Sequence, residues 1–139
     1  MTGYLIIGLN KIDMNEIIKK VKSLGFLPGS YAVFGSGPMT IRGLKEAKDI
    51  DIAVKDEFFE ELKGKHKEFK PGQINIGDVE IFAAWNSLID NPEEVIDRAD
   101  NIDGVKFIKL EDLIVWKKKL AREKDLSDIK VIEDYLIQK

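Results

Sequence analysis

The chain has 139 residues, which is long enough for one domain with a hydrophobic core and too short for two comfortable ones. Its composition, 44% hydrophobic and 34% charged, is normal for a globular protein and excludes a disordered or collagen-like class. The net charge of −3 argues against a surface that binds duplex DNA, and the lack of cysteine excludes disulfides and thiolate metal sites. We therefore expect a cytoplasmic, single-domain protein.

The first residues, 1–13, precede the first clear helix signal. Their apolar stretch Tyr4–Leu9 predicts either an extra edge strand or a loosely held arm. It is too short to span a membrane and has no basic flank, so no membrane association or targeting signal is expected. Asp13 followed three residues later by Glu16 forms a capping box, which predicts a helix that ends at Gly25.

The next segment alternates between strand and loop signals. Tyr31–Phe34 predicts a buried strand that leads directly into the loop Gly35-Ser36-Gly37, and a short helix or turn is expected over residues 39–44. Asp49–Val54 alternates acidic with aliphatic residues, which is typical of a strand. In such a strand, Asp49 and Asp51 share one face.

A helix and a hairpin are predicted next. Asp56 can cap a helix that ends at Gly64. Gln73–Ile76 and Val79–Phe82 flank Gly77-Asp78, a two-residue turn typical of β-hairpins.

The C-terminal third is predicted to be mainly helical. Asn91-Pro92 starts a short helix, residues 105–108 form a short strand, and from about residue 110 two helices follow with a break near residues 122–124. The apolar stripe of these helices consists of Leu113, Leu120, Leu126, Ile129, Ile132 and Leu136. The expected fold class is α/β (α+β): a mixed β-sheet with flanking helices and a C-terminal helical tail, folded as one domain over residues 14–139.

Acidic side chains on the predicted strands indicate a metal site. Asp49 and Asp51 would lie about 7 Å apart on one strand face, and such a pair requires cations. Their hard oxygen ligands suit Mg²⁺ or Mn²⁺ together with substrate phosphates. Asp78 falls in the hairpin turn, so we expect Glu80, within the strand, to be the third acid, as a metal ligand or as the general base.

The loop Gly35-Ser36-Gly37 indicates an anion site. It follows a strand and precedes a helical turn that Pro38 can start, so its amides can surround a phosphate while the Ser36 hydroxyl donates to an oxygen. Its glycine spacing matches neither a P-loop nor a dinucleotide-binding fingerprint.

The order of these motifs resembles the nucleotidyltransferase superfamily: Val33-Phe-Gly-Ser36, then Arg42-Gly43, then Asp49-Ile-Asp-Ile52. The resemblance implies a nucleotidyltransferase fold in which the Gly-Ser loop holds the triphosphate of ATP or another nucleoside triphosphate, and the paired acids hold metal. The form is similar to minimal nucleotidyltransferases, except that the gap between Ser36 and Arg42 is longer. Arg42 is accordingly expected either to bind phosphate or to cap the loop.

The tail also carries part of the resemblance. Residues 110–117, followed by Lys124-Asp125 and Asp128, are similar to the C-terminal helices of abortive-infection nucleotidyltransferases, so the likeness covers roughly residues 30–130. Lys117 could approach the triphosphate, although three consecutive lysines must mostly face solvent. Lys124, Asp125 and Asp128 could belong to the site or be surface partners near a helix start.

The expected function is metal-dependent transfer of a nucleoside monophosphate from a nucleoside triphosphate to a hydroxyl, with release of pyrophosphate. The acceptor would be a protein, an RNA end or a small molecule. The alternative is a binding module of weak or no activity that retains the fold, such as an antitoxin-like or regulatory partner of a toxin or another protein.

Overall fold

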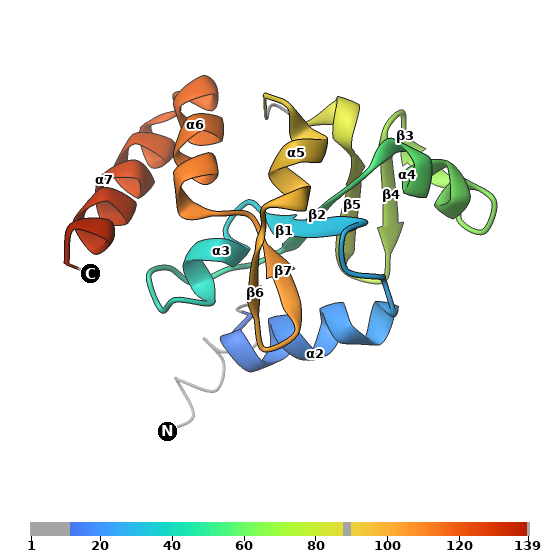
Figure 1. Cartoon of the computed structure of the whole chain (residues 1–139), viewed down its shortest axis with the longest axis horizontal. Coiled ribbons are helices and arrows are strands. Elements are labelled where there is room, and N and C mark those ends of the chain that lie inside the picture. Colours follow the sequence, from blue (N-terminus) through green and yellow to red (C-terminus); the bar gives the residue numbers. More distant parts are fainter. Residues whose placement is uncertain (1–11, 88–89, 139) are drawn as a thin grey trace.

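The computed structural model describes residues 12–87 and 90–138 (Figure 1). The apolar stretch over residues 4–9 lies outside the described residues. A seven-stranded sheet is flanked by helices, which confirms the expected mixed α+β class. The strands are β1 (Tyr31–Phe34), β2 (Ile50–Val54), β3 (Glu68–Lys70), β4 (Gln73–Ile76), β5 (Val79–Ala83), β6 (Asp100–Ile102) and β7 (Val105–Phe107). The helices are α2 (Met14–Leu24), α3 (Gly37–Thr40), α4 (Asp56–Lys63), α5 (Pro92–Asp97), α6 (Leu110–Leu120) and α7 (Glu123–Ile137), with a 3₁₀ turn at Ala84–Asn86.

The sheet has the order β3-β4-β5-β2-β1-β7-β6. The β4–β5 hairpin and the antiparallel β1–β2 pair form its centre, and β2 and β5 run parallel to each other. This parallel pairing fixes the relative positions of the two acid-bearing strands. Two short edge strands, β3 and β6, complete the sheet; neither was expected from the sequence.

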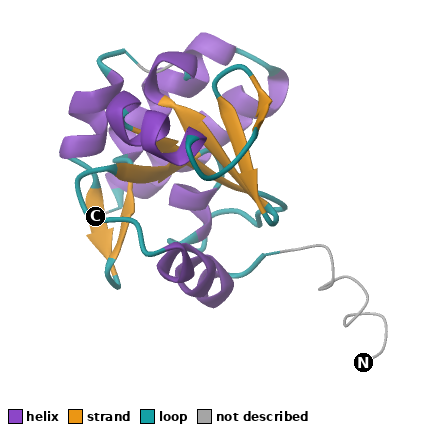
Figure 2. Ribbon diagram, turned by 90° about the vertical axis from the view of Figure 1, so that its right-hand side faces the viewer, coloured by secondary structure: helices purple, strands orange, loops and turns teal. Residues whose placement is uncertain are grey.

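Each face of the sheet is covered by its own helices. On one face, α2 and α4 bury Ile17, Val21, Phe59 and Leu62 against aliphatic side chains of β2 and β5. On the other face, α5, α6 and α7 pack on alternate residues of the same strands. In Figure 1, α2 lies below the strands and α5 above them, and the side view in Figure 2 shows strands between helices. Because side chains alternate along a strand, the acids of β2 and β5 lie on the face that α5, α6 and α7 cover.

Several sequence signals act as predicted. The Asp13 side chain accepts the Glu16 N–H at 2.9 Å, and Gly25 ends α2 with φ of 69°. The tail forms two helices that break at Ala121, close to the expected position. Ile129 and Ile132 of the predicted apolar stripe are buried.

The short helix or turn predicted over residues 39–44 is confirmed, because α3 ends at Thr40 and turn residues follow it. Two other local predictions were wrong. Lys55, not Asp56, occupies the cap position of α4, and the Asp56 carboxylate instead accepts the Trp85 N–H at 3.2 Å. Leu126 is part of the predicted apolar stripe, yet the residue is 57% exposed. In the described ranges, no helix combines the length and apolarity needed to cross a membrane.

Candidate active site

The candidate site is a cleft of about 840 Å³ between the sheet and the C-terminal helices. Its floor includes Gly35, Ser36 and Asp51 at adjoining ends of β1 and β2. Its far wall comes from α6, α7 and the segment between them. The cleft therefore brings together the loop, the acidic strand and the tail, which the sequence had singled out separately.

Asp51 and Glu80 are neighbours in the sheet. Because β2 and β5 are parallel and Asp51 is paired with Glu80, their side chains point to the same face. Asp78 lies in the turn between β4 and β5, where it pairs with Lys20 of α2. The predicted hairpin register is thus confirmed, and it places Glu80 rather than Asp78 beside Asp51.

The Asp51 carboxyl has an unusual environment. Burial, together with the charges of Glu80 and Asp49, raises its pKa from 3.8 to about 7. Its Oδ1 atom is buried and has no hydrogen-bond partner among the residues that the structure describes. A buried carboxylate oxygen without a partner is costly, so the position is suited to a bound cation.

The other two acids surround Asp51 less tightly. Burial and the charge of Asp49 raise the pKa of Glu80, and Lys70 partly offsets this. Asp49 is exposed and lines the cleft, one residue before β2 begins, whereas Glu80 lies beside the floor without contributing to the lining. Within residues 12–87 and 90–138, no three acidic or histidine side chains are already close enough to form a metal-binding group. The acids perturb one another but do not form a preassembled three-ligand cage.

The loop is fitted closely around Asp51. Gly35 has a φ of 69°, and a Cβ atom at this residue would lie 2.6 Å from Oδ2 of Asp51, so only glycine is compatible with both the backbone and the space. Ser36 precedes α3, but its side chain makes no capping hydrogen bond; its carbonyl instead accepts the Thr40 hydroxyl at 3.0 Å. The Ser36 hydroxyl is therefore not used to cap the helix.

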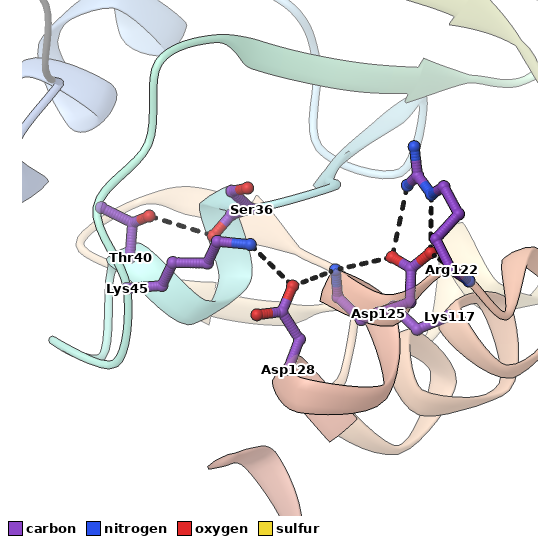
Figure 3. A network of polar contacts seen from close by, with 7 residues as sticks. All are labelled: Ser36, Thr40, Lys45, Lys117, Arg122, Asp125 and Asp128. Atoms are coloured by element: carbon purple, nitrogen blue, oxygen red, sulfur yellow. Dashed lines mark hydrogen bonds and ion pairs between the residues drawn. The ribbon is translucent and has the colours of Figure 1, made fainter. Parts of the chain in front are cut away.

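An ionic network with a buried centre lines the cleft on the side of α6 and α7 (Figure 3). The Lys117 ammonium lies 2.9 Å from Asp128 and 3.7 Å from Asp125, and the side chains of Lys117 and Asp125 are only 4% and 0% exposed. Lys45 reaches the same Asp128 oxygen at 2.6 Å, and Arg122 holds Asp125 at 2.7 Å. Lys118 and Lys119 are exposed, as expected for most of the three consecutive lysines, whereas Lys117 is buried because two carboxylates from α7 stabilise its charge inside the protein.

The basic groups of the network lower the pKa values of its two acids, Asp125 and Asp128. Burial opposes ionisation of Asp125, but the hydrogen bonds from Arg122 outweigh it and hold the pKa of Asp125 below its usual value. Burial likewise opposes ionisation of Asp128, and Lys45 and Lys117 together lower its pKa. The network thus links α6 and α7 to the segment that follows α3.

Arg42 does not reach this cleft. Its guanidinium donates to the Pro38 carbonyl at 2.7 Å and pairs with Asp100 at 2.9 Å. It lines a separate cavity of about 280 Å³ with Lys109. Arg42 was predicted either to bind phosphate or to cap the loop. The geometry favours capping, because Arg42 holds the short helix α3 that follows the loop.

Sequence reasoning missed several basic residues of the cleft. Lys124, which had been considered, does line it, but Lys45, Lys48, Lys70 and Arg122 had not been singled out. The first two lie in the segment that joins the Gly-Ser loop to the acidic strand, so their position in the chain was an available signal. Lys70 lies on β3, an edge strand that the sequence pattern did not reveal.

No protein-family model matches this chain, and no curated protein matches it.

Proposed function

We propose that the chain is a metal-dependent nucleotidyltransferase that transfers a nucleoside monophosphate from a nucleoside triphosphate to a hydroxyl acceptor. The observation that carries the proposal is the Asp51 carboxylate, which lies beside Glu80 and lines the cleft together with Gly35 and Ser36. Its Oδ1 atom is buried and, within residues 12–87 and 90–138, has no hydrogen-bond partner. A nucleotidyltransferase fold is part of the same proposal.

Asp51 is the principal candidate metal ligand, with Asp49 and Glu80 beside it. Mg²⁺ uses one or two protein carboxylates together with substrate phosphates, so a complete three-acid cage is not required before nucleotide binds. A bound Mg²⁺ or Mn²⁺ would neutralise charge on the phosphate oxygens. The donor set fits such an ion because it is composed of oxygen atoms and carries excess negative charge.

The chain's own residues would then position and activate the reactants. The loop at Gly35 and Ser36 would hold the triphosphate through backbone amides and the serine hydroxyl. Glu80 would accept the proton of the acceptor hydroxyl, and its raised pKa favours this role. The acceptor oxygen would form a bond to the α-phosphorus while the bond between that phosphorus and the bridging oxygen breaks, releasing pyrophosphate.

A second candidate function is a nucleotide-binding module without useful turnover. One observation favours it: the ammonium groups of Lys45 and Lys117 are already paired with Asp128 instead of projecting free into the cleft. Binding of nucleotide without transfer would be expected if this pairing persists.

The test is incubation with each α-labelled nucleoside triphosphate, Mg²⁺ or Mn²⁺, and the protein itself, RNA or cell extract as acceptor. We expect a labelled acceptor with wild-type protein, loss of label in Asp51→Asn and Glu80→Gln, and full labelling in Asp78→Asn, the matched turn variant. Full activity of Asp51→Asn would contradict the proposal. Metal-dependent nucleotide binding without labelling of any acceptor would favour the binding module.

A further inference from the structure

One side of the cleft is apolar, in contrast to the charged groups that line the rest. Phe82 of β5 and Trp116 and Leu120 of α6 line it, and each is half-buried. We call these three residues the apolar wall. The Phe34 ring lies 5.4 Å from that of Phe82 and 5.3 Å from that of Trp116, with both pairs edge to face. A core ring thus fixes two aromatic side chains that still line the cleft.

Phe82 of the apolar wall and the Gly-Ser loop lie in opposite directions from the Asp51–Glu80 pair along the strands. Phe34 is paired with Asp51 in the antiparallel β1–β2 pair, so the loop that starts at Gly35 extends toward the beginning of β2. Phe82 lies two residues beyond Glu80 in β5 and is paired with Ala53, further along β2 in the other direction. Two residues of strand correspond to about 7 Å, on the same face. The order along these strands is therefore the loop, then Asp51 with Glu80, then Phe82, and Trp116 packs on the same Phe34 ring as Phe82.

We infer that the apolar wall binds the nucleobase of the nucleotide substrate, mainly by stacking and apolar contact. This inference rests on the proposed function, because that function places the triphosphate at the loop and the α-phosphate at the carboxylates. The base then extends away from the loop, where Phe82 and Trp116 offer aromatic surface. Bases stack on aromatic side chains whatever their sequence identity, since every base has a π-face.

The lining also specifies which nucleotides are preferred. Purine rings cover more of the wall than pyrimidine rings do, so ATP and GTP are the preferred substrates and bind several-fold more tightly than CTP and UTP.

Fluorescence can test the inference without altering the wall. The chain has two tryptophans, and Trp85 is 57% exposed and does not line the cleft. Trp85→Phe keeps the backbone N–H that bonds Asp56 and leaves Trp116 as the sole reporter. In this variant with Mg²⁺, ATP and GTP should change the Trp116 emission on binding. Inorganic tripolyphosphate should bind, as followed by calorimetry, and leave the emission unchanged.

Variants of the wall provide the second measurement. Phe82→Ala should weaken ATP binding about five- to a hundredfold and leave tripolyphosphate binding unchanged, as expected for the loss of one stacking partner. Leu120→Gln, at the end of α6, should act in the same direction with less effect on the core, and thermal unfolding checks that each variant is folded.

The outcomes separate the two proposals. If ATP binds without changing Trp116 emission, if pyrimidine nucleotides bind as tightly as purine nucleotides, or if Phe82→Ala and Leu120→Gln leave ATP affinity unchanged, the apolar wall does not bind the base while the proposed function stands. If neither ATP nor tripolyphosphate binds the wild-type protein with Mg²⁺ or Mn²⁺, the proposed function itself is wrong and the inference falls with it.

Discussion

Replacing Asp51 with asparagine should stabilise the metal-free protein above neutral pH. In the native state the pKa of this carboxyl is raised from 3.8 to about 7, by burial and by the charges of Glu80 and Asp49. Between these two values the native protein retains a proton that the unfolded chain has released, so the free energy of unfolding of the wild type falls as pH rises through this window. About three pKa units at 1.36 kcal/mol each give a cost of about 4 kcal/mol above neutral pH.

The variant lacks this ionisation, so its free energy of unfolding should exceed that of the wild type by an amount that grows with pH and reaches roughly 2–4 kcal/mol at about pH 8.5. The lower end of this range reflects the asparagine amide, which is buried and also lacks a hydrogen-bond partner. The assay is thermal and urea unfolding followed by circular dichroism in EDTA, at about pH 5 and about pH 8.5. Adding Mg²⁺ should stabilise the wild type and not the variant. Asp78→Asn, in an exposed turn, should change stability by less than about 1 kcal/mol with no gain at high pH. An Asp51→Asn protein no more stable than wild type at the higher pH would refute the reasoning.

Three further substitutions probe the loop and the network. Gly35→Ala should lower stability by roughly 1–3 kcal/mol, because it combines positive φ with a clash against the buried carboxylate, and melting temperature reports it. Ser36→Ala should lower the affinity for ATP about fivefold and leave the affinity for AMP nearly unchanged in calorimetry, because one hydrogen bond to a phosphate, contributing about 1 kcal/mol, is lost. Lys117→Met should cost about 3 kcal/mol in urea unfolding by leaving buried Asp128 with one cation fewer, whereas its exposed neighbour Lys118→Met should stay within about 0.5 kcal/mol.

For each of these three substitutions, one outcome would contradict the prediction. A Gly35→Ala protein with unchanged melting temperature would contradict the close fit of the loop. Equal weakening of AMP and ATP in Ser36→Ala would show that the loop does not hold the triphosphate tail. Equal stability of the Lys117→Met and Lys118→Met proteins would show that the network is not energetically important.

The central fold was predictable because its signals are local. The Asp13 cap, the turn at Gly77-Asp78 and the alternation of β2 depend on neighbouring residues alone, and the structure confirms all three. The edge strands β3 and β6 were not predictable, since each has three residues, none of them fully buried, and no periodic apolar pattern. Their formation depends on pairing with β4 and β7.

The candidate site was predictable only in part. Placing Glu80 beside Asp51 required the correct hairpin register, which the turn residues supplied. The burial of Lys117 depends on two carboxylates of another helix, although its spacing from Leu113 places it on the apolar stripe of α6 and could have indicated it. The ion pair of Arg42 joins residues 58 positions apart, and nothing in the local sequence specifies it.

Helices α6 and α7 contribute neighbouring residues to both the hydrophobic core and the cleft. Leu113 and Ile132 fill the core beneath α6 and α7, while Trp116, Lys117 and Asp128 line the cleft. A local opening of these helices would remove one whole wall of the cleft while leaving the β1–β2–β5 centre of the sheet paired. Occupation of the cleft would oppose that opening, so protection of backbone amides from hydrogen exchange should increase most in α6 and α7, at a distance from the strands that carry the acids.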